Sequence, residues 1–213
     1  FLTSTYEDAI KYDPISPSAH LDAGRAWLLA ADVLALRASQ SKDKEEAKNL
    51  QLERDGAINK AIAHLEKSAT LKPDFASSHY LLAQAYVRQN DLKGAIRKLE
   101  DTKAVAIGDV GVLFQLGLLY YQANELDKAQ VEFEQAVQFN ENYSNARYFL
   151  GLIYDQKGNK PGAIEQFKKI QALNPDNTEV RAIIMNLENG KSALSQVVPP
   201  LPAPEKRKEP PVR

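Results

Sequence analysis

The feature that most constrains the fold of this chain is an internal repeat with a 34-residue period. Tyr86, Tyr120 and Tyr154 follow one another at 34-residue spacing. Two more sets of residues keep the same spacing. The first is Ala95, Ala129 and Ala163, and the second is Leu99, Phe133 and Phe167. Three sets of residues that share one period predict a stack of equivalent supersecondary units.

Each unit has the sequence pattern of a helical hairpin. Apolar residues recur at intervals of three and four, as in LFQLGLLYYQ and AQVEFEQAV. This is the periodicity of an amphipathic helix, and it differs from the alternation of a strand. Polar turns that contain Asn, Asp or Gly, such as QNDLKG and QKGNKPG, separate the two helical stretches. Such residues end one helix and begin the next.

Small residues indicate where the two helices of a unit meet. Gly117 and Gly151 are expected to let the first helix approach Ala129 and Ala163 of the second, with larger apolar side chains around the contact. Either Gly117→Leu or Ala129→Phe is therefore predicted to overpack this contact, at a cost of about 1–3 kcal/mol.

The repeated residues resemble a known signature. Leu116, Gly117 and Tyr120, followed by Ala129 and Phe133, resemble the tetratricopeptide repeat (TPR). The resemblance covers residues 1 to 190. It implies an all-α fold, a TPR α-solenoid in which helical hairpins stack into a right-handed superhelix.

The resemblance divides the chain into segments. They are the second helix of a truncated repeat at 1–16, a repeat with a 25-residue insertion at 17–75, three regular repeats at 76–109, 110–143 and 144–177, a capping helix at 178–190 and a disordered proline-rich tail at 191–213. The tail is expected to be disordered because it has few side chains that could form a core and is rich in proline.

The insertion in the repeat at 17–75 is expected to lengthen both helices of that hairpin. Leu29, Val33 and Leu36 continue the first helix at helical spacing, and SQSKDK at 39–44 is expected to form a polar tip. If the insertion is divided equally, each helix gains about 12 residues, or about 18 Å. A flexible loop is the alternative, although loops of this length are uncommon in compact units.

The first helices of a TPR stack line its concave wall, and this is the surface that the resemblance implies for binding. Tyr80, Phe114 and Tyr148 form an aromatic ladder at 34-residue spacing on the face that hairpin closure does not use. The predicted partner-binding groove consists of Tyr80, Gln84, Phe114, Gln115, Leu118, Tyr121, Tyr148 and Leu152. Aromatic anchors with polar flanks suit an extended peptide or an amphipathic helix. The alternative is that the aromatic side chains only pack between adjacent first helices.

Other function classes receive little support. The 27 basic and 28 acidic residues give a net charge of −1, which offers no electrostatic case for nucleic acid, and there is no cysteine. His20 and His79 occupy equivalent places and are expected to be core or boundary residues, while His64 stands alone on a second helix. There is no glycine-rich phosphate loop and no zinc-protease or nucleophile-elbow motif. We therefore expect a non-enzymatic scaffold for a protein or peptide partner, without a metal, a small-molecule cofactor or a catalytic residue.

A narrower resemblance concerns the order of the segments. It is similar to that of the C-terminal repeat regions of large multi-span bacterial envelope proteins of the O-antigen ligase or polymerase type. This implies a TPR region tethered to a membrane through upstream sequence, with the polysaccharide chemistry upstream as well. The chain begins at Phe1 and shows no signal-peptide pattern, so it is expected to be a piece of a longer protein. Its location stays open between the cytoplasm and a membrane.

Overall fold

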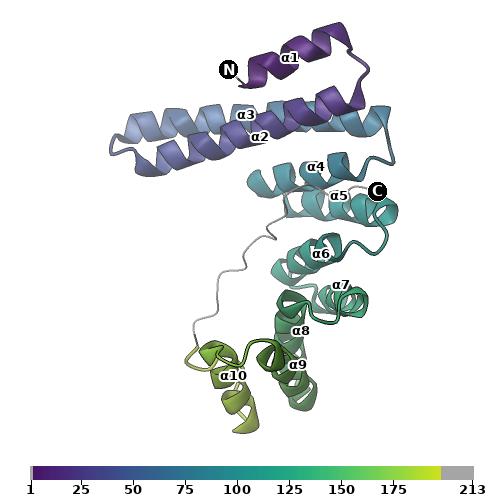
Figure 1. Ribbon diagram of the computed structural model, residues 1–213. Helices are drawn as coiled ribbons and strands as arrows, with labels where there is room; N and C mark the ends of the chain where they lie inside the picture. Colours follow the sequence, from purple (N-terminus) through teal and green to yellow (C-terminus); the bar gives the residue numbers. More distant parts are fainter. Residues whose placement is uncertain (1, 198–213) are drawn as a thin grey trace. The chain divides into compact units, whose positions relative to one another are not determined.

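The structure of the protein is a computed structural model (Figure 1), and it describes residues 2–197. In this part of the chain it forms ten α-helices and no strand. The first compact unit, which ends at Ile107, contains α1 (Leu2–Tyr12), α2 (Pro17–Gln40), α3 (Lys44–Leu71), α4 (Ala76–Arg88) and α5 (Leu92–Val105). The second unit, which begins at Gly108, contains α6 (Val110–Gln122), α7 (Leu126–Phe139), α8 (Ser144–Gln156), α9 (Lys160–Leu173) and α10 (Thr178–Glu188). The predicted all-α fold is confirmed, whereas the prediction of disorder at 198–213 lies outside the described residues.

The regular hairpins are built alike because their turns use the same backbone conformation. Helices α4, α6 and α8 have 13 residues each, and α5, α7 and α9 have 14 each. The turns between them place Asn90, Asn124 and Gly158 at φ values of 60°, 59° and 78°. Asn and Gly tolerate this left-handed conformation better than other residues. The polar turns seen in the sequence therefore serve to reverse the chain at a fixed point of each repeat.

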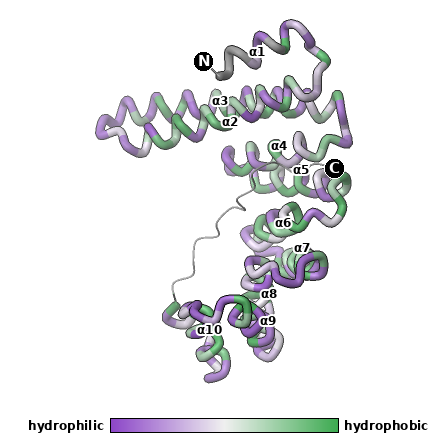
Figure 2. Tube along the Cα trace, viewed as in Figure 1, coloured by the Kyte–Doolittle hydropathy of each residue, from purple (hydrophilic) through white to green (hydrophobic). Residues whose placement is uncertain are grey.

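The insertion forms the expected elongated hairpin. Helix α2 has 24 residues and α3 has 28, against 13 and 14 in the regular hairpins (Figure 1). Figure 2 shows hydrophilic residues at the end of the hairpin where α2 turns into α3. There the carboxylate of Asp43 accepts hydrogen bonds from the backbone N–H groups of Glu45 and Glu46 and caps α3.

The elongated hairpin has a separate cluster of three buried residues, against which Trp27, Leu34 and Ile62 pack. Ala31, Ala57 and Ile58 are at most 3% exposed and form its core. The stripe of Leu29, Val33 and Leu36 keeps its helical spacing but lies on the outer face of α2, where these side chains are exposed by 54%, 50% and 57% respectively. The helical periodicity of this stripe is thus correct, and its apolar character is not explained by the hairpin core.

The close contact inside each hairpin differs from the expected one. A Cβ added at Gly117 would lie 2.6 Å from Cε1 of Phe133, and one added at Gly151 would lie 2.6 Å from Cε2 of Phe167. The glycines therefore make room for the aromatic rings of the second helix, and not primarily for the alanines. In the first unit the Leu65 side chain takes the same place against Gly24.

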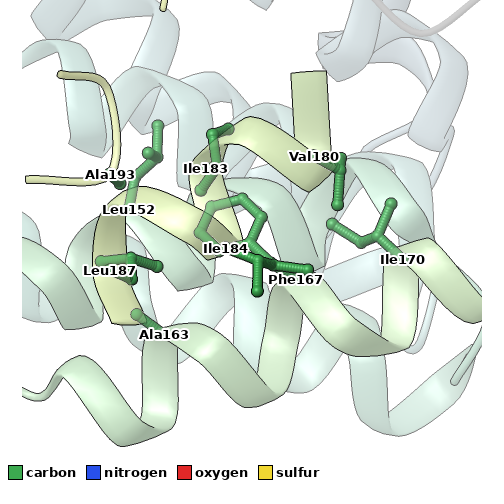
Figure 3. Packing of buried hydrophobic residues seen from close by; sticks show 9 residues of the cluster. All are labelled: Leu152, Ala163, Phe167, Ile170, Val180, Ile183, Ile184, Leu187 and Ala193. Carbon is green, nitrogen blue, oxygen red and sulfur yellow. The ribbon is translucent and has the colours of Figure 1, made fainter. Parts of the chain in front are cut away.

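Helix α10 closes the core of the second unit (Figure 3). It contributes Val180, Ile183, Ile184 and Leu187, which are at most 6% exposed and pack with Phe167 of α9. These are the residues that the sequence assigns to the inner face of the closing helix. The helix ends before Gly190, whose φ of 73° turns the chain back.

The residues that follow α10 correct the prediction for the start of the tail. The sequence assigns residues 191–197 to the disordered tail, but they form turns that pack against the second unit, and Ala193 is only 1% exposed. The prediction is wrong here because side chains of α8, α9 and α10 hydrogen-bond to the backbone of this segment.

None of the helices in residues 2–197 combines the length and the apolar character needed to cross a membrane.

Candidate functional site

The eight residues of the predicted groove divide into two groups of four. The buried group, at most 5% exposed, consists of Tyr80, Phe114, Leu118 and Leu152. The partly exposed group consists of Gln84, Gln115, Tyr121 and Tyr148. The buried residues pack between helices and are not accessible anchors. Since six of the eight lie on α6 and α8 of the second unit, the site is described there.

Phe114 is part of an aromatic cluster inside the second unit. Its ring lies 5.9 Å from Phe133, 5.4 Å from Tyr143 and 6.0 Å from Phe149, measured between ring centroids. Aromatic pairs at such distances contribute about 0.5–1.5 kcal/mol each beyond their burial. Packing, the alternative to partner binding, therefore accounts for the aromatic residue at this position of the ladder.

Phe149 is the residue that joins the two partly exposed tyrosines, and the sequence analysis missed it. Its ring centroid lies 5.5 Å from that of Tyr121 and 5.6 Å from that of Tyr148, in both cases edge to face. It also stacks on Phe133 at 5.5 Å. Its counterpart in the preceding repeat is Gln115, so the repeat offered no aromatic ladder that would have pointed to it.

Polar groups border these rings. The Nε2 amide of Gln156 donates a hydrogen bond to the Tyr121 hydroxyl at 2.8 Å, and the Tyr148 hydroxyl donates to Oε1 of Glu179 at 2.9 Å. Burial, with the hydrogen bond to Glu179, raises the pKa of Tyr148 well above its ordinary value. Tyr148 is therefore a neutral donor at physiological pH. The Nε2 atom of Gln115 is buried without a hydrogen-bond partner.

A second recurrent contact, also missed in the sequence, holds the start of the first helices. At equivalent positions, a side chain bonds to the backbone carbonyl six residues earlier. The pairs are His20 with Pro14 at 3.1 Å, His79 with Pro73 at 2.8 Å, Arg147 with Glu141 at 2.7 Å and Arg181 with Pro175 at 2.9 Å. These contacts tie α2, α4, α8 and α10 to the turns before them, which gives the two histidines a structural role, whereas α6 has Leu113 at this position.

The histidines form one further contact that corrects the sequence analysis. His64 does not stand alone, because its Nδ1 lies 3.2 Å from Nδ1 of His20. Since the Nε2 atom of His20 faces the Pro14 carbonyl, a neutral His20 donates there and accepts from His64. Burial lowers the pKa of His64. Within the described residues, no group of three or more His, Asp or Glu side chains is placed to hold a metal ion.

A hollow of about 620 Å³ lies beside α7, α8 and α9. The buried Arg147 lines it and donates from Nη1 to Oε1 of Gln166 at 2.7 Å. Lys169 adds a second positive charge, but Glu134 and Glu141 line the same hollow. Its charges balance, so the hollow selects no charged class of ligand. The partly exposed face of α6 and α8, which carries Tyr121 and Tyr148, remains the better candidate.

Repeated helical hairpins with this spacing define the chain as a helical repeat protein of the kind that serves as a scaffold for protein interactions. The family model described as "Tetratricopeptide repeat" matches residues 52–105 and 114–178. The chain therefore belongs to the tetratricopeptide repeat family, as its repeated residues predict.

Comparisons with individual proteins agree with this assignment. BBSome complex member BBS4 of Bos taurus is 27% identical over 126 residues, which is 59% of this chain but 24% of that protein. The chain thus spans about a quarter of the length of this relative. The crystal structure of MamA has a TM-score of 0.64 at 24% identity and covers 84% of this chain and 89% of its own. YrrB, described as a TPR protein with an unusual peptide-binding site, has a TM-score of 0.52 at 18% identity, with 83% and 95% coverage. These two structures support the fold alone.

Proposed function

We propose that this chain is a non-enzymatic scaffold that binds an extended peptide or an amphipathic helix of a partner protein on the partly exposed face of α6 and α8 that carries Tyr121 and Tyr148. The observation that carries the proposal is the pair of partly exposed tyrosines, Tyr121 and Tyr148, held on either side of Phe149. A rigid aromatic pair with polar groups beside it is a common basis for peptide recognition.

The chemistry of this face suits an uncharged stretch of peptide. The tyrosine rings offer apolar contact at a small cost in side-chain entropy, because each ring is already fixed by Phe149 and by a hydrogen bond. The hydroxyl of Tyr121 and the amide of Gln156 can exchange their mutual hydrogen bond for bonds to peptide backbone.

The relatives support the proposal only in outline. BBS4 is named as a member of a complex, and YrrB is described as having a peptide-binding site. Both descriptions concern those proteins. Membership of the TPR family makes a protein or peptide the expected class of partner, and the partly exposed face of α6 and α8 is our assignment of where it binds.

Site-specific photo-crosslinking tests the assignment. A benzophenone amino acid replaces Tyr121 in one variant, Tyr148 in a second and Val131 in a control. Val131 is 47% exposed on α7, outside the proposed face. We expect the first two variants to label one segment of one partner, and a synthetic peptide of that segment to suppress the labelling. Labelling from Val131 alone, or labelling that the peptide does not suppress, would contradict the proposal.

A further inference from the structure

The chain places a segment of its own on the second unit, as a bound peptide would lie. After α10 ends, residues 191–197 fold back, and Ala193 enters the cluster formed with Leu152 of α8 and Leu187 of α10 (Figure 3). Leu194 and Val197 are partly buried against the same cluster. The segment therefore buries one small and two larger apolar side chains.

The polar contacts of this segment are made mainly to its backbone. Oδ2 of Asp155 accepts from the Ala193 N–H at 2.7 Å, and Nδ2 of Asn186 donates to the carbonyl groups of Ala193 at 3.1 Å and Ser195 at 2.7 Å. Nζ of Lys160 donates to the Lys191 carbonyl at 2.7 Å. Both the N–H and the carbonyl of Ala193 are thus held by side chains of the folded unit. This is recognition of an irregular main chain by side chains, which is the chemistry that peptide binding needs.

The acceptor carboxylate is held in place by the folded unit itself. Asp155 is only 8% exposed and forms an ion pair with Lys160 at 2.9 Å. Burial alone would raise the pKa of Asp155, but the hydrogen bond from Ala193 and the ion pair with Lys160 hold it below its ordinary value. The group is therefore charged at neutral pH and is a strong acceptor for a backbone N–H.

The segment lies on the face to which ligand binding has been assigned. Asp155 and Leu152 are the counterparts, one repeat later, of Tyr121 and Leu118 on α6. We propose that residues 191–197 are an intramolecular peptide ligand that closes the last position of the binding face. A partner peptide of the same chemistry, with a small residue at the Ala193 position and apolar residues after it, would displace the segment. This inference rests on the proposed function, because it concerns one end of the same face.

The short connection to α10 explains why the segment of residues 191–197, and not a free peptide, occupies this position in the chain alone. Only four residues separate Ala193 from Glu188, the last residue of α10, and such short tethers give effective concentrations in the millimolar range. A free peptide of equal intrinsic affinity therefore binds poorly to the intact chain. Its binding is expected to appear once the segment is released.

The test measures binding of a fluorescent peptide with the sequence of residues 190–197, GKSALSQV, to the full chain by fluorescence anisotropy. In the Ala193→Arg variant the buried methyl group is replaced by a long charged side chain, which expels the segment. Gln196→Arg is the matched control, because Gln196 is exposed and the same charge is added. Hydrogen exchange of the Ala193–Ser195 amides and the far-UV circular dichroism report release of the segment and the integrity of the fold. If Ala193→Arg unfolds the unit, Leu194→Arg serves as the second releasing variant.

We expect the releasing variant to bind the peptide at least tenfold more tightly than wild type, while Gln196→Arg behaves as wild type. Adding Asp155→Ala to the releasing variant should remove the gain. The inference is overturned if the segment is released from a folded chain and the peptide still binds no better than to wild type, since the segment is then only a structural cap. Crosslinking at Tyr121, which lies on α6, reports on the proposed function separately: labelling there with no gain in peptide binding refutes this inference alone.

Discussion

The substitution Gly117→Ala tests the contact that closes each hairpin. An alanine Cβ at this position would lie 2.6 Å from Cε1, 2.8 Å from Cδ1 and 3.0 Å from Cζ of Phe133. Carbon atoms make favourable contact at about 3.5–4.0 Å, so the ring has to move by roughly 1 Å. Phe133 is fully buried and lies against other rings of the cluster, which leaves it little room to move.

The expected magnitude follows from two opposing effects. Overpacking of a well-packed core costs about 1–3 kcal/mol, whereas alanine is favoured over glycine inside a helix by about 1 kcal/mol. The net expectation for Gly117→Ala is a loss of about 0–2 kcal/mol in the free energy of unfolding. Gly56→Ala isolates the second effect, because Gly56 is exposed within α3 and an added Cβ would meet nothing within 4 Å. That substitution should stabilise the protein by up to about 1 kcal/mol.

Equilibrium unfolding in urea, followed by far-UV circular dichroism, gives both values. The difference between the two substitutions is the overpacking cost, about 1–3 kcal/mol. The reasoning is refuted if Gly117→Ala stabilises the protein as much as Gly56→Ala does. As a further check, Phe133→Leu combined with Gly117→Ala recreates the pair of Ala83 and Leu99 in the repeat at 76–109, and it should recover part of the loss.

Three further predictions concern polar contacts. Because burial lowers the pKa of His64 in the folded protein, the unfolded chain binds a proton at this residue more readily. The free energy of unfolding should therefore fall as the pH drops below about 6.5. Urea titrations at several pH values should show this dependence, and His64→Gln should flatten it. Arg147→Ala removes two hydrogen bonds of a buried side chain and should lower the free energy of unfolding by about 1–3 kcal/mol. Arg181→Ala, at the exposed equivalent position, should change it by at most about 0.5 kcal/mol. Equal losses of the two variants in thermal melts would argue against the role of burial. Asp32→Ala breaks a half-exposed pair with Arg88 and should cost no more than about 1 kcal/mol, with the loss shrinking in high salt.

The sequence predicts the fold well because its repeat is carried by residues that close each hairpin. Tyrosine, alanine and aromatic positions at 34-residue spacing identify the helices, and the spacing from Trp27 to Ala61 reveals the elongated hairpin. These features depend on contacts inside one hairpin or between neighbouring hairpins. They are therefore visible in a periodic pattern.

The candidate site is harder to predict because periodicity assigns a residue to a face but does not say what covers that face. Phe114 and Tyr148 occupy equivalent positions, yet Phe114 is 1% exposed and Tyr148 is partly exposed. Phe149, which departs from the repeat, packs against both rings. The pairing of His20 with His64, 44 residues apart, leaves no periodic signal either.

The docked C-terminal segment shows the same limit. Composition marks residues 191–213 as a tail, because the segment is polar and leads into a proline-rich stretch. Its order depends on Asp155, which lies 38 residues before Ala193. The resemblance to O-antigen ligase or polymerase proteins, and the membrane tether that it implies, stay predictions, since neither the fold nor the relatives bear on them.

The most direct test of the account is the affinity of the partner segment, once crosslinking has identified it, for alanine variants of the proposed face. Isothermal titration calorimetry would compare Tyr121→Ala and Tyr148→Ala with Val131→Ala. The account predicts that each tyrosine variant binds at least tenfold more weakly, a change of about 1.4 kcal/mol, while the Val131 variant binds as wild type does. Unchanged affinity in both tyrosine variants, with folding intact, would show that the partner binds elsewhere.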